Sequence, residues 1–297
     1  MSPAVRTLDE SVRRAQAAER LGYESVWTRQ LPGERDAALV LAAYAMHTER
    51  IKLGTGVLPV YTRHPSAMAQ MAATLDELSG GRFILGIGVS HKVTVEGMWG
   101  LHLEHPVDAM REYVTIVRSI VRDGQVAFEG RHFTARVAYS GPRRADMPLM
   151  ISAVNPRMLE LAGEVADGVV LYMCGPEYIN DEVLPALRRG REKAGKSMAG
   201  FEVVAGIDAC VTSDRTAALG VYQKTLDRYA SLPYYRRAME AGHFDADNLA
   251  AIGDATQVRD AIARYREAGV TLPGVGPFSG HDAAKGFEAT LEVAAEA

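Results

Sequence analysis

The sequence predicts an α/β fold built from parallel strand-helix-strand units, and three observations point to it. Short apolar runs alternate with amphipathic helical patterns along most of the chain. The stretch Leu53 to His91 shows the unit most clearly, with a strand, a turn, a helix opened by Pro65, the pair Gly80-Gly81 and a second strand. The length of 297 residues suits one domain over residues 1–297, because an α/β barrel takes roughly 250 residues.

The first helix is expected to begin at Thr7, because Glu10 stands three residues later in the spacing of a capping box. A second helix is expected over residues 36–47, capped by Asp36 and burying one apolar face made of Leu39, Val40, Ala43 and Met46. Further helices are expected over residues 65–78, 106–122, 156–165, 176–194 and 281–295. Two or more helices are expected to fill residues 214–268, with a break at Pro233.

Seven strands are expected between these helices, over residues 23–28, 51–60, 82–89, 148–154, 168–173, 201–211 and 270–278. Three excursions from the repeating pattern are expected near residues 92–105, 124–147 and 230–250. The middle one lacks helical periodicity and predicts a hairpin over the barrel mouth.

Composition excludes several classes of protein. The net charge of −4 gives no basic field for nucleic acid. No apolar run is long enough to span a bilayer or to form the core of a signal peptide. Two cysteines, Cys174 and Cys210, suit a reducing compartment. We therefore expect a cytoplasmic protein with neither a membrane nor a nucleic acid as partner, and no residue set has the spacing of metal ligands.

Three runs, YTRHP, ATLDELSGGRF and LGIGVSH, resemble the bacterial-luciferase-like family of flavin and deazaflavin oxidoreductases. The resemblance is closest to the branch that uses coenzyme F420, a deazaflavin, and extends from about Thr7 to Phe278. It implies a (β/α)8 TIM barrel that transfers hydride between F420 and a small organic substrate. It also implies a homodimer and a separate enzyme that reduces the cofactor.

The first barrel strand is a departure from the family, which places it before the first helix. Only Met1 to Arg6 precede Thr7, and Val5 is the strong strand former among them. The first strand is therefore expected to be short or missing. Three explanations stay open: a vestigial strand, a chain start inside a longer protein, or another segment in its place.

Two strand ends are expected to bind the cofactor ring. By resemblance, the turn Thr55-Gly56-Val57 bulges behind the ring and carries a non-proline cis peptide between Gly56 and Val57; the alternative is an ordinary glycine turn. In the run GIGVSH, small residues such as Gly88 let a planar ring approach the backbone. Ser90 follows in this pocket, and His91 donates a proton or bonds a ring carbonyl, unless it is a structural histidine.

The proton donor is harder to assign, because many relatives place an acid and a histidine where this chain has Gln30 and Leu31. Gln30 bonds a ring but is no general acid near pH 7. The nearest carboxylate that could replace the acid is Glu96, although a loop glutamate is commonly just solvated.

Two further strand ends are expected to contact the cofactor by resemblance. Asn155 bonds the polar edge of the ring, caps the helix that begins at Pro156, or does both. The turn Met173-Cys174-Gly175-Pro176 opens a helix whose N-terminus holds the cofactor phosphate.

Two other functions stay open. A reduced-FMN monooxygenase would use oxygen and a partner reductase, and both branches share the barrel and the phosphate turn. A non-catalytic flavin-binding protein would explain Gln30, Leu31 and the short start of the chain. The helix over residues 65–78, rich in Ala and Met, is either a dimer contact or ordinary barrel packing.

Overall fold

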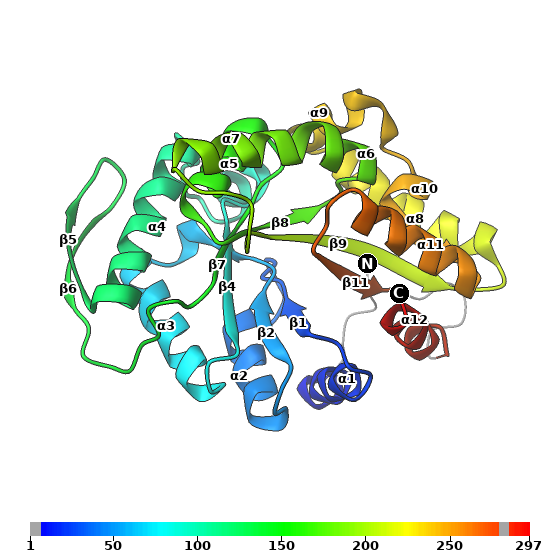
Figure 1. Ribbon diagram of the computed structural model, residues 1–297, viewed down its shortest axis with the longest axis horizontal. Coiled ribbons are helices and arrows are strands. Elements are labelled where there is room, and N and C mark those ends of the chain that lie inside the picture. Colours follow the sequence, from blue (N-terminus) through cyan, green and yellow to red (C-terminus); the bar gives the residue numbers. More distant parts are fainter. Residues whose placement is uncertain (1–6, 279–284) are drawn as a thin grey trace.

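The computed structural model describes residues 7–278 and 285–297, and it shows a curled parallel sheet covered by helices (Figure 1). Within these ranges the sheet runs β1-β2-β4-β7-β8-β9, with β11 and β10 both paired to β9 and β3 paired to β4. The strands are β1 (Ser25–Thr28), β2 (Lys52–Thr55), β3 (Leu58–Pro59), β4 (Phe83–Gly88), β7 (Leu149–Ser152), β8 (Gly168–Tyr172), β9 (Glu202–Val211), β10 (Ala250–Gly253) and β11 (Leu272–Pro277).

The helices pack on the outer side of this sheet. The long ones are α1 (Leu8–Arg20), α2 (Ala37–His47), α3 (Pro65–Leu78), α4 (Pro106–Asp123), α5 (Pro156–Val165), α7 (Leu184–Lys193), α8 (Arg215–Ala230), α11 (Ala255–Glu267) and α12 (Lys285–Ala295). The short ones are α6 (Pro176–Tyr178), α9 (Arg236–Ala238) and α10 (Ala246–Leu249), with 3₁₀ or π turns over Val60–Thr62, Val93–Met98, Ile179–Val183, Pro233–Tyr235 and Met239–His243.

All seven predicted strands are present, and local capping follows the sequence. The backbone N–H of Glu10 donates to the Thr7 hydroxyl at 3.1 Å. Asp36 caps α2 by accepting from the N–H groups of Ala38 and Leu39. These caps satisfy donors that the first turn of a helix leaves free, so short-range chemistry sets both helix starts.

The predicted inner face of α2 is wrong in two positions. Leu39 and Met46 are each 72% exposed, whereas Val40 and Leu41 are buried. The helix is apolar on nearly every side, so periodicity alone does not tell its inner face from its outer one.

Three other expectations need correction. The chain at residues 250–253, expected to be helical, forms β10, which extends the sheet beside the second half of β9. The hairpin of β5 (Gln125–Glu129) and β6 (Thr134–Ala138) exists, but it packs outside α3 and α4 and does not cover the barrel mouth (Figure 1). The helix expected over residues 176–194 is divided into α6, a π turn and α7.

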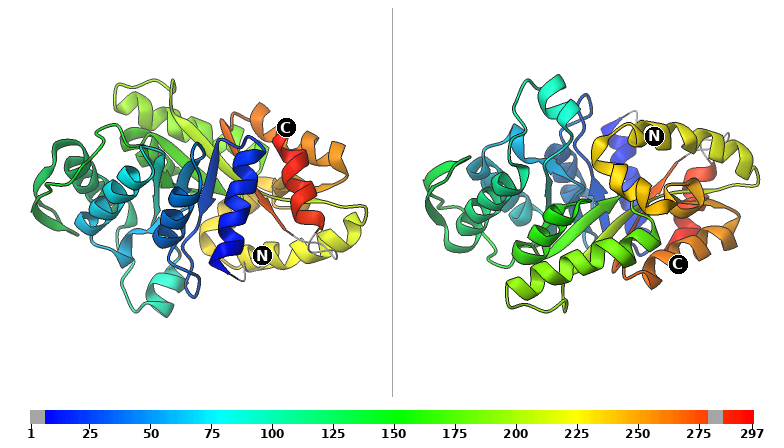
Figure 2. Two further views of the ribbon diagram at one scale, coloured as in Figure 1. Left: turned by 90° about the horizontal axis from the view of Figure 1, so that it is seen from below. Right: turned by 90° about the horizontal axis from the view of Figure 1, so that it is seen from above.

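The last corner of the barrel lies between β1 and β11. Each has one strand neighbour among the described residues, β2 and β9 respectively. Outside this corner α1 and α12 lie side by side (Figure 2), with the Arg14 guanidinium 4.0 Å from the centre of the Phe287 ring. The predicted short or missing first strand falls on residues 1–6, which lie outside the described residues.

Candidate functional site

A cavity of about 1320 Å³ opens at the C-terminal ends of the barrel strands and continues toward α1 and α12. Side chains alternate along a strand, so every second residue faces the barrel interior. Inward residues of six strands line the cavity, among them Trp27, Gly88, Ser152, Tyr172, Gly206 and Gly276. This is the end of a β/α barrel where active sites lie.

The predicted turn after β2 forms one wall, and its cis peptide is at Gly56-Val57, as predicted. Gly56 and Val57 line the cavity, whereas Thr55 is fully buried behind them. The Thr55 hydroxyl donates to the Gly86 carbonyl and accepts from the Gly86 N–H, both at 2.7 Å. A Cβ at Gly86 would meet the Thr55 carbonyl at 2.0 Å. The glycine therefore lets this turn approach β4 closely.

Gly88 and Ser90 also line the cavity, beside His91. The Nδ1 atom of His91 is buried and has no hydrogen-bond partner among the described residues. Burial lowers the pKa of His91, helped by the charge of Arg228, so the ring is neutral near pH 7. A buried unpaired ring nitrogen costs free energy, and a ligand in the cavity would supply its partner.

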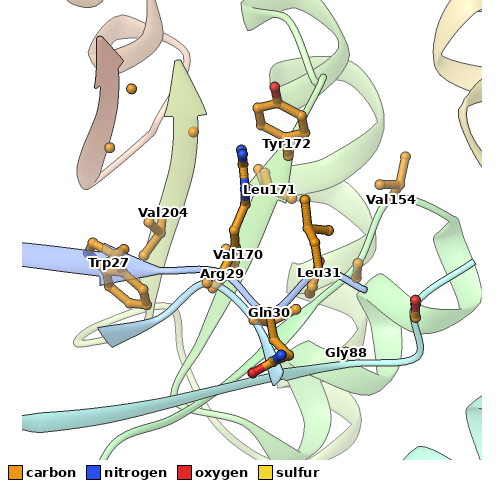
Figure 3. Close-up of a pocket in the computed structure, with 18 of the residues that line it drawn as sticks. Trp27, Arg29, Gln30, Leu31, Gly88, Val154, Val170, Leu171, Tyr172 and Val204 are labelled. Atoms are coloured by element: carbon orange, nitrogen blue, oxygen red, sulfur yellow. The ribbon is translucent and has the colours of Figure 1, made fainter. Parts of the chain in front are cut away.

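The segment after β1 runs along the cavity through Arg29, Gln30 and Leu31, which all line it. The side-chain oxygen of Gln30 accepts from the backbone N–H of Ala37 at 2.8 Å, so this atom caps the start of α2. Arg29 pairs with Glu34 at 3.3 Å and extends toward the side of Tyr172, away from Gln30 (Figure 3). The catalytic role of Gln30 stays a prediction.

Asn155 lines the cavity, and its side chain makes no capping hydrogen bond at the start of α5, so it is available to a ligand. Glu96 does not line the cavity. Its carboxylate lies 3.6 Å from the Lys92 ammonium and accepts from the Leu103 N–H at 3.3 Å. The structure therefore uses Glu96 to hold its own loop, and its catalytic role stays a prediction.

The predicted phosphate turn does not reach the cavity. The side chains of Met173 and Cys174 are buried, and a Cβ at Gly175 would lie 3.4 Å from the Asn248 carbonyl. Burial raises the pKa of the Cys174 thiol to about 12, which keeps it from acting as a nucleophile near pH 7. Pro176, also buried, opens a helix of three residues. The phosphate role of this turn stays a prediction.

Several residues that line the cavity were not predicted. Tyr172, Tyr229, Tyr234 and Tyr235 bring four phenol rings to the mouth, two of them about 6 Å from the His91 ring. Tyr172 ends a predicted strand, so the barrel rule could have found it. Tyr229 lies in the last turn of α8. Tyr234 and Tyr235 come from an irregular segment whose position no local pattern indicates.

The sequence model described as luciferase-like monooxygenase matches residues 1–272. The chain belongs to this family. A putative coenzyme F420-dependent oxidoreductase of Mycobacterium tuberculosis is 34% identical over 310 residues, covering 86% of this chain and 87% of that protein. The 5,10-methylenetetrahydromethanopterin reductase of Methanopyrus kandleri is 30% identical, covering 91% and 89%.

Solved structures agree on the fold. The F420-dependent tetrahydromethanopterin reductase of Methanopyrus kandleri superposes with a TM-score of 0.80 at 26% identity, covering 99% of this chain and 95% of that one. The oxygenating constituent of 3,6-diketocamphane monooxygenase of Pseudomonas putida, in complex with FMN, gives 0.76 at 20% identity, covering 99% and 94%. The chain is thus a luciferase-like TIM barrel, and its relatives support a flavin or deazaflavin as cofactor.

Neither a metal site nor a membrane-spanning helix is found within the described parts of the chain. No group of three His, Cys, Asp or Glu side chains there could hold a metal ion. Likewise, none of the helices in these ranges is long and apolar enough to cross a membrane.

Proposed function

We propose that this protein is an F420-dependent oxidoreductase that transfers hydride between the deazaflavin and a small organic substrate. The observation that carries the proposal is the wall made by Gly56, Val57 and Gly88, which lines the same cavity as a buried His91 nitrogen with no hydrogen-bond partner among the described residues. The 34% identical relative, itself putatively F420-dependent, supports the same cofactor.

The residues at the mouth fit a planar tricyclic group. Gly56 and Val57 form an apolar surface for one face of the ring. A Cβ at Gly88 would lie 2.8 Å from the Val57 side chain, so a larger residue at position 88 would displace this surface. His91 and Asn155 both line the cavity and would bond the polar edge of the ring. When bound, the deazaflavin supplies the hydride chemistry, while the protein orients the reactants and excludes water.

A second candidate function is a reduced-FMN-dependent monooxygenase. The family description and the FMN complex with the same fold favour it. The cavity volume of about 1320 Å³ exceeds that of most small-ligand pockets, so it has room for either ring system. A third candidate, a flavin-binding protein without catalysis, would use the same pocket.

The deciding experiment is a fluorescence titration of the purified cofactor-free protein with oxidised F420 and, separately, with FMN. We expect F420 to bind at micromolar concentration or below and FMN to bind more weakly. His91→Asn should weaken F420 binding, whereas the control His47→Asn, on the exposed side of α2, should not. Preference for FMN would support the monooxygenase, and binding without turnover of a substrate panel would support the third candidate.

We also propose a homodimer that works with a separate enzyme supplying the reduced cofactor. Leu39 and Met46 lie on the same face of α2, about two turns apart, and both are 72% exposed. Exposed apolar side chains on one face of a helix suit a subunit contact. Light scattering of the wild type and of the Leu39→Glu variant tests this, with a monomeric wild type as the opposing result.

A further inference from the structure

Tyr172 and Asp208 form a hydrogen-bonded pair inside the mouth of the barrel. Tyr172 is the last residue of β8, and Asp208 lies on the neighbouring strand β9, three residues before its end. The Tyr172 hydroxyl donates to Asp208 Oδ2 at 2.6 Å. Tyr172 lines the cavity. Asp208 faces the same interior, because Val204 and Gly206, two and one inward positions earlier on β9, also line the cavity.

The barrel makes room for this pair with two glycines. A Cβ at Gly206, the register partner of Tyr172, would lie 3.1 Å from the Tyr172 ring. A Cβ at Gly276, the partner of Asp208 on β11, would lie 3.2 Å from Asp208 Oδ1. A larger residue at either position would push the ring or the carboxyl group aside.

Among the described residues, Tyr172 is the hydrogen-bond partner that the structure gives Asp208. Burial raises the pKa of Asp208, and the bond from Tyr172 and the charge of Arg29 lower it only in part. Burial also raises the pKa of Tyr172, as does the charge of Asp208, so the phenol keeps its proton. Within residues 7–278 and 285–297, the titratable groups other than Arg29 that are coupled to the pair are Tyr222, Tyr229 and Tyr265, from helices α8 and α11.

We infer that Tyr172 and Asp208 are the proton-transfer pair of this active site, with Tyr172 in contact with the substrate and Asp208 as the group that reprotonates it. The inference rests on the proposed function and names its proton donor. The pair occupies a barrel end at which Gln30 and Leu31 offer no acid, and Glu96 is engaged in its own loop.

The proton balance is simple. A carbonyl or imine carbon that gains a hydride from the reduced deazaflavin leaves its electron pair on oxygen or nitrogen. The Tyr172 O–H bond breaks and a new bond forms from this proton to that heteroatom. Asp208 takes part in its protonated form, which burial favours: it returns its proton to the phenolate, and water then restores the carboxyl group. In the oxidation direction each proton moves the opposite way, and the two electrons leave with the hydride.

The first test needs no cofactor. Protein labelled with carbon-13 at the aspartate carboxyl carbons is titrated by NMR, and the Asp208 resonance is assigned by its loss in Asp208→Asn. We expect Asp208 to titrate above the ordinary aspartate value of about 3.9. Tyr172→Phe should raise it further, because the variant removes a bond that favours the carboxylate. Tyr113→Phe, another buried tyrosine whose hydroxyl donates to the Arg63 carbonyl, should leave it unchanged.

Titration of Asp208 at or below the ordinary value, or no response to Tyr172→Phe, would overturn the inference. The second test measures oxidation of reduced F420 by a panel of small ketones and cyclic imines. Tyr172→Phe and Asp208→Asn should lower kcat by about 10²–10⁴-fold with F420 affinity unchanged, whereas Tyr113→Phe keeps the wild-type rate. A wild-type rate in Tyr172→Phe refutes the inference alone, and failure of the wild type to bind F420 refutes the proposed function.

Discussion

The two ends of the barrel differ in how fully their polar groups are hydrogen-bonded. At the N-terminal end, Arg82 immediately precedes β4. Its guanidinium donates hydrogen bonds of 2.7–3.1 Å to carbonyl or hydroxyl oxygens of Ser79, Thr48, Ile51 and Ala45. Nearby, the Glu19 carboxylate accepts from three consecutive backbone N–H groups, those of Glu49, Arg50 and Ile51.

At the C-terminal end, polar atoms stay without partners. His91 Nδ1 and the Tyr61 hydroxyl are buried and unpaired among the described residues, and Asp208 shares a single bond with Tyr172. Buried polar groups normally have hydrogen-bond partners. An end of the barrel that leaves such groups without partners is therefore suited to binding a ligand. The N-terminal end stabilises the fold, and the mouth gives up stability for binding.

The largest effect on stability is expected for Arg82→Met, which removes every donor of the N-terminal network. Several part-buried carbonyl oxygens would lose their partner, so we expect a loss of about 3 kcal/mol in the free energy of unfolding. Urea denaturation measures it. Arg136→Met, which removes an exposed pair with Glu129, should cost less than about 1 kcal/mol. An equal loss in both variants would remove the distinction between the two ends.

Glu19→Gln should cost about 1–2 kcal/mol near pH 7, because charged acceptors bond backbone N–H groups more strongly than amides do. Burial alone would raise the pKa of Glu19, but the three N–H donors outweigh it and hold the pKa below its usual range. The contribution is therefore present above the unfolded value of about 4.3 and lost as the pH falls through the folded pKa. Unfolding curves from pH 7 to acid should converge for the two proteins; parallel curves would contradict this.

Asp208→Asn is expected to change stability in the other direction. The pKa of Asp208 is raised in the folded protein by burial, so the ionised form disfavours folding at pH values above that pKa. The variant should be more stable near pH 7 by about 0.5–2 kcal/mol, and the gain should vanish below the unfolded value of about 3.9. A less stable variant near pH 7 would show that Asp208 serves the fold.

The smallest effect on stability is expected for His91→Phe. The Nδ1 atom that it removes has no hydrogen-bond partner in the part of the chain that the structure describes, and phenylalanine keeps the packing against Tyr234 and Tyr235. The free energy of unfolding should change by less than about 1 kcal/mol, while the Kd for F420 rises. Loss of stability without loss of affinity would make His91 a structural residue.

Local patterns in the sequence predicted much of the barrel. The capping residues Thr7 and Asp36, the helix that begins at Pro65 and seven strands are all found in the structure. The turn at Gly56-Val57 came from the family resemblance, and the structure has its cis peptide there. These features depend on contacts within a few residues, or on motifs long enough to specify a family.

The errors share a different cause. The strand at 250–253 is short and forms only by pairing with the second half of β9, so no local pattern in the sequence predicted it. The inner face of α2 depends on which side meets the sheet, because nearly all its side chains are apolar. The turn from Met173 to Pro176 looked like an open helix start, yet the α10 segment at Asn248 covers it.

The sequence by itself determined the α/β barrel, the family and the strand ends where the chemistry gathers, because capping, periodicity and glycine placement act over short distances. The tertiary structure alone decided which strand ends share one cavity. Tyr172 and Asp208 are 36 residues apart in the chain and meet only through the register of β8 and β9. Pairing between strands far apart in sequence, and the burial that follows from it, is set by the curled sheet as a whole.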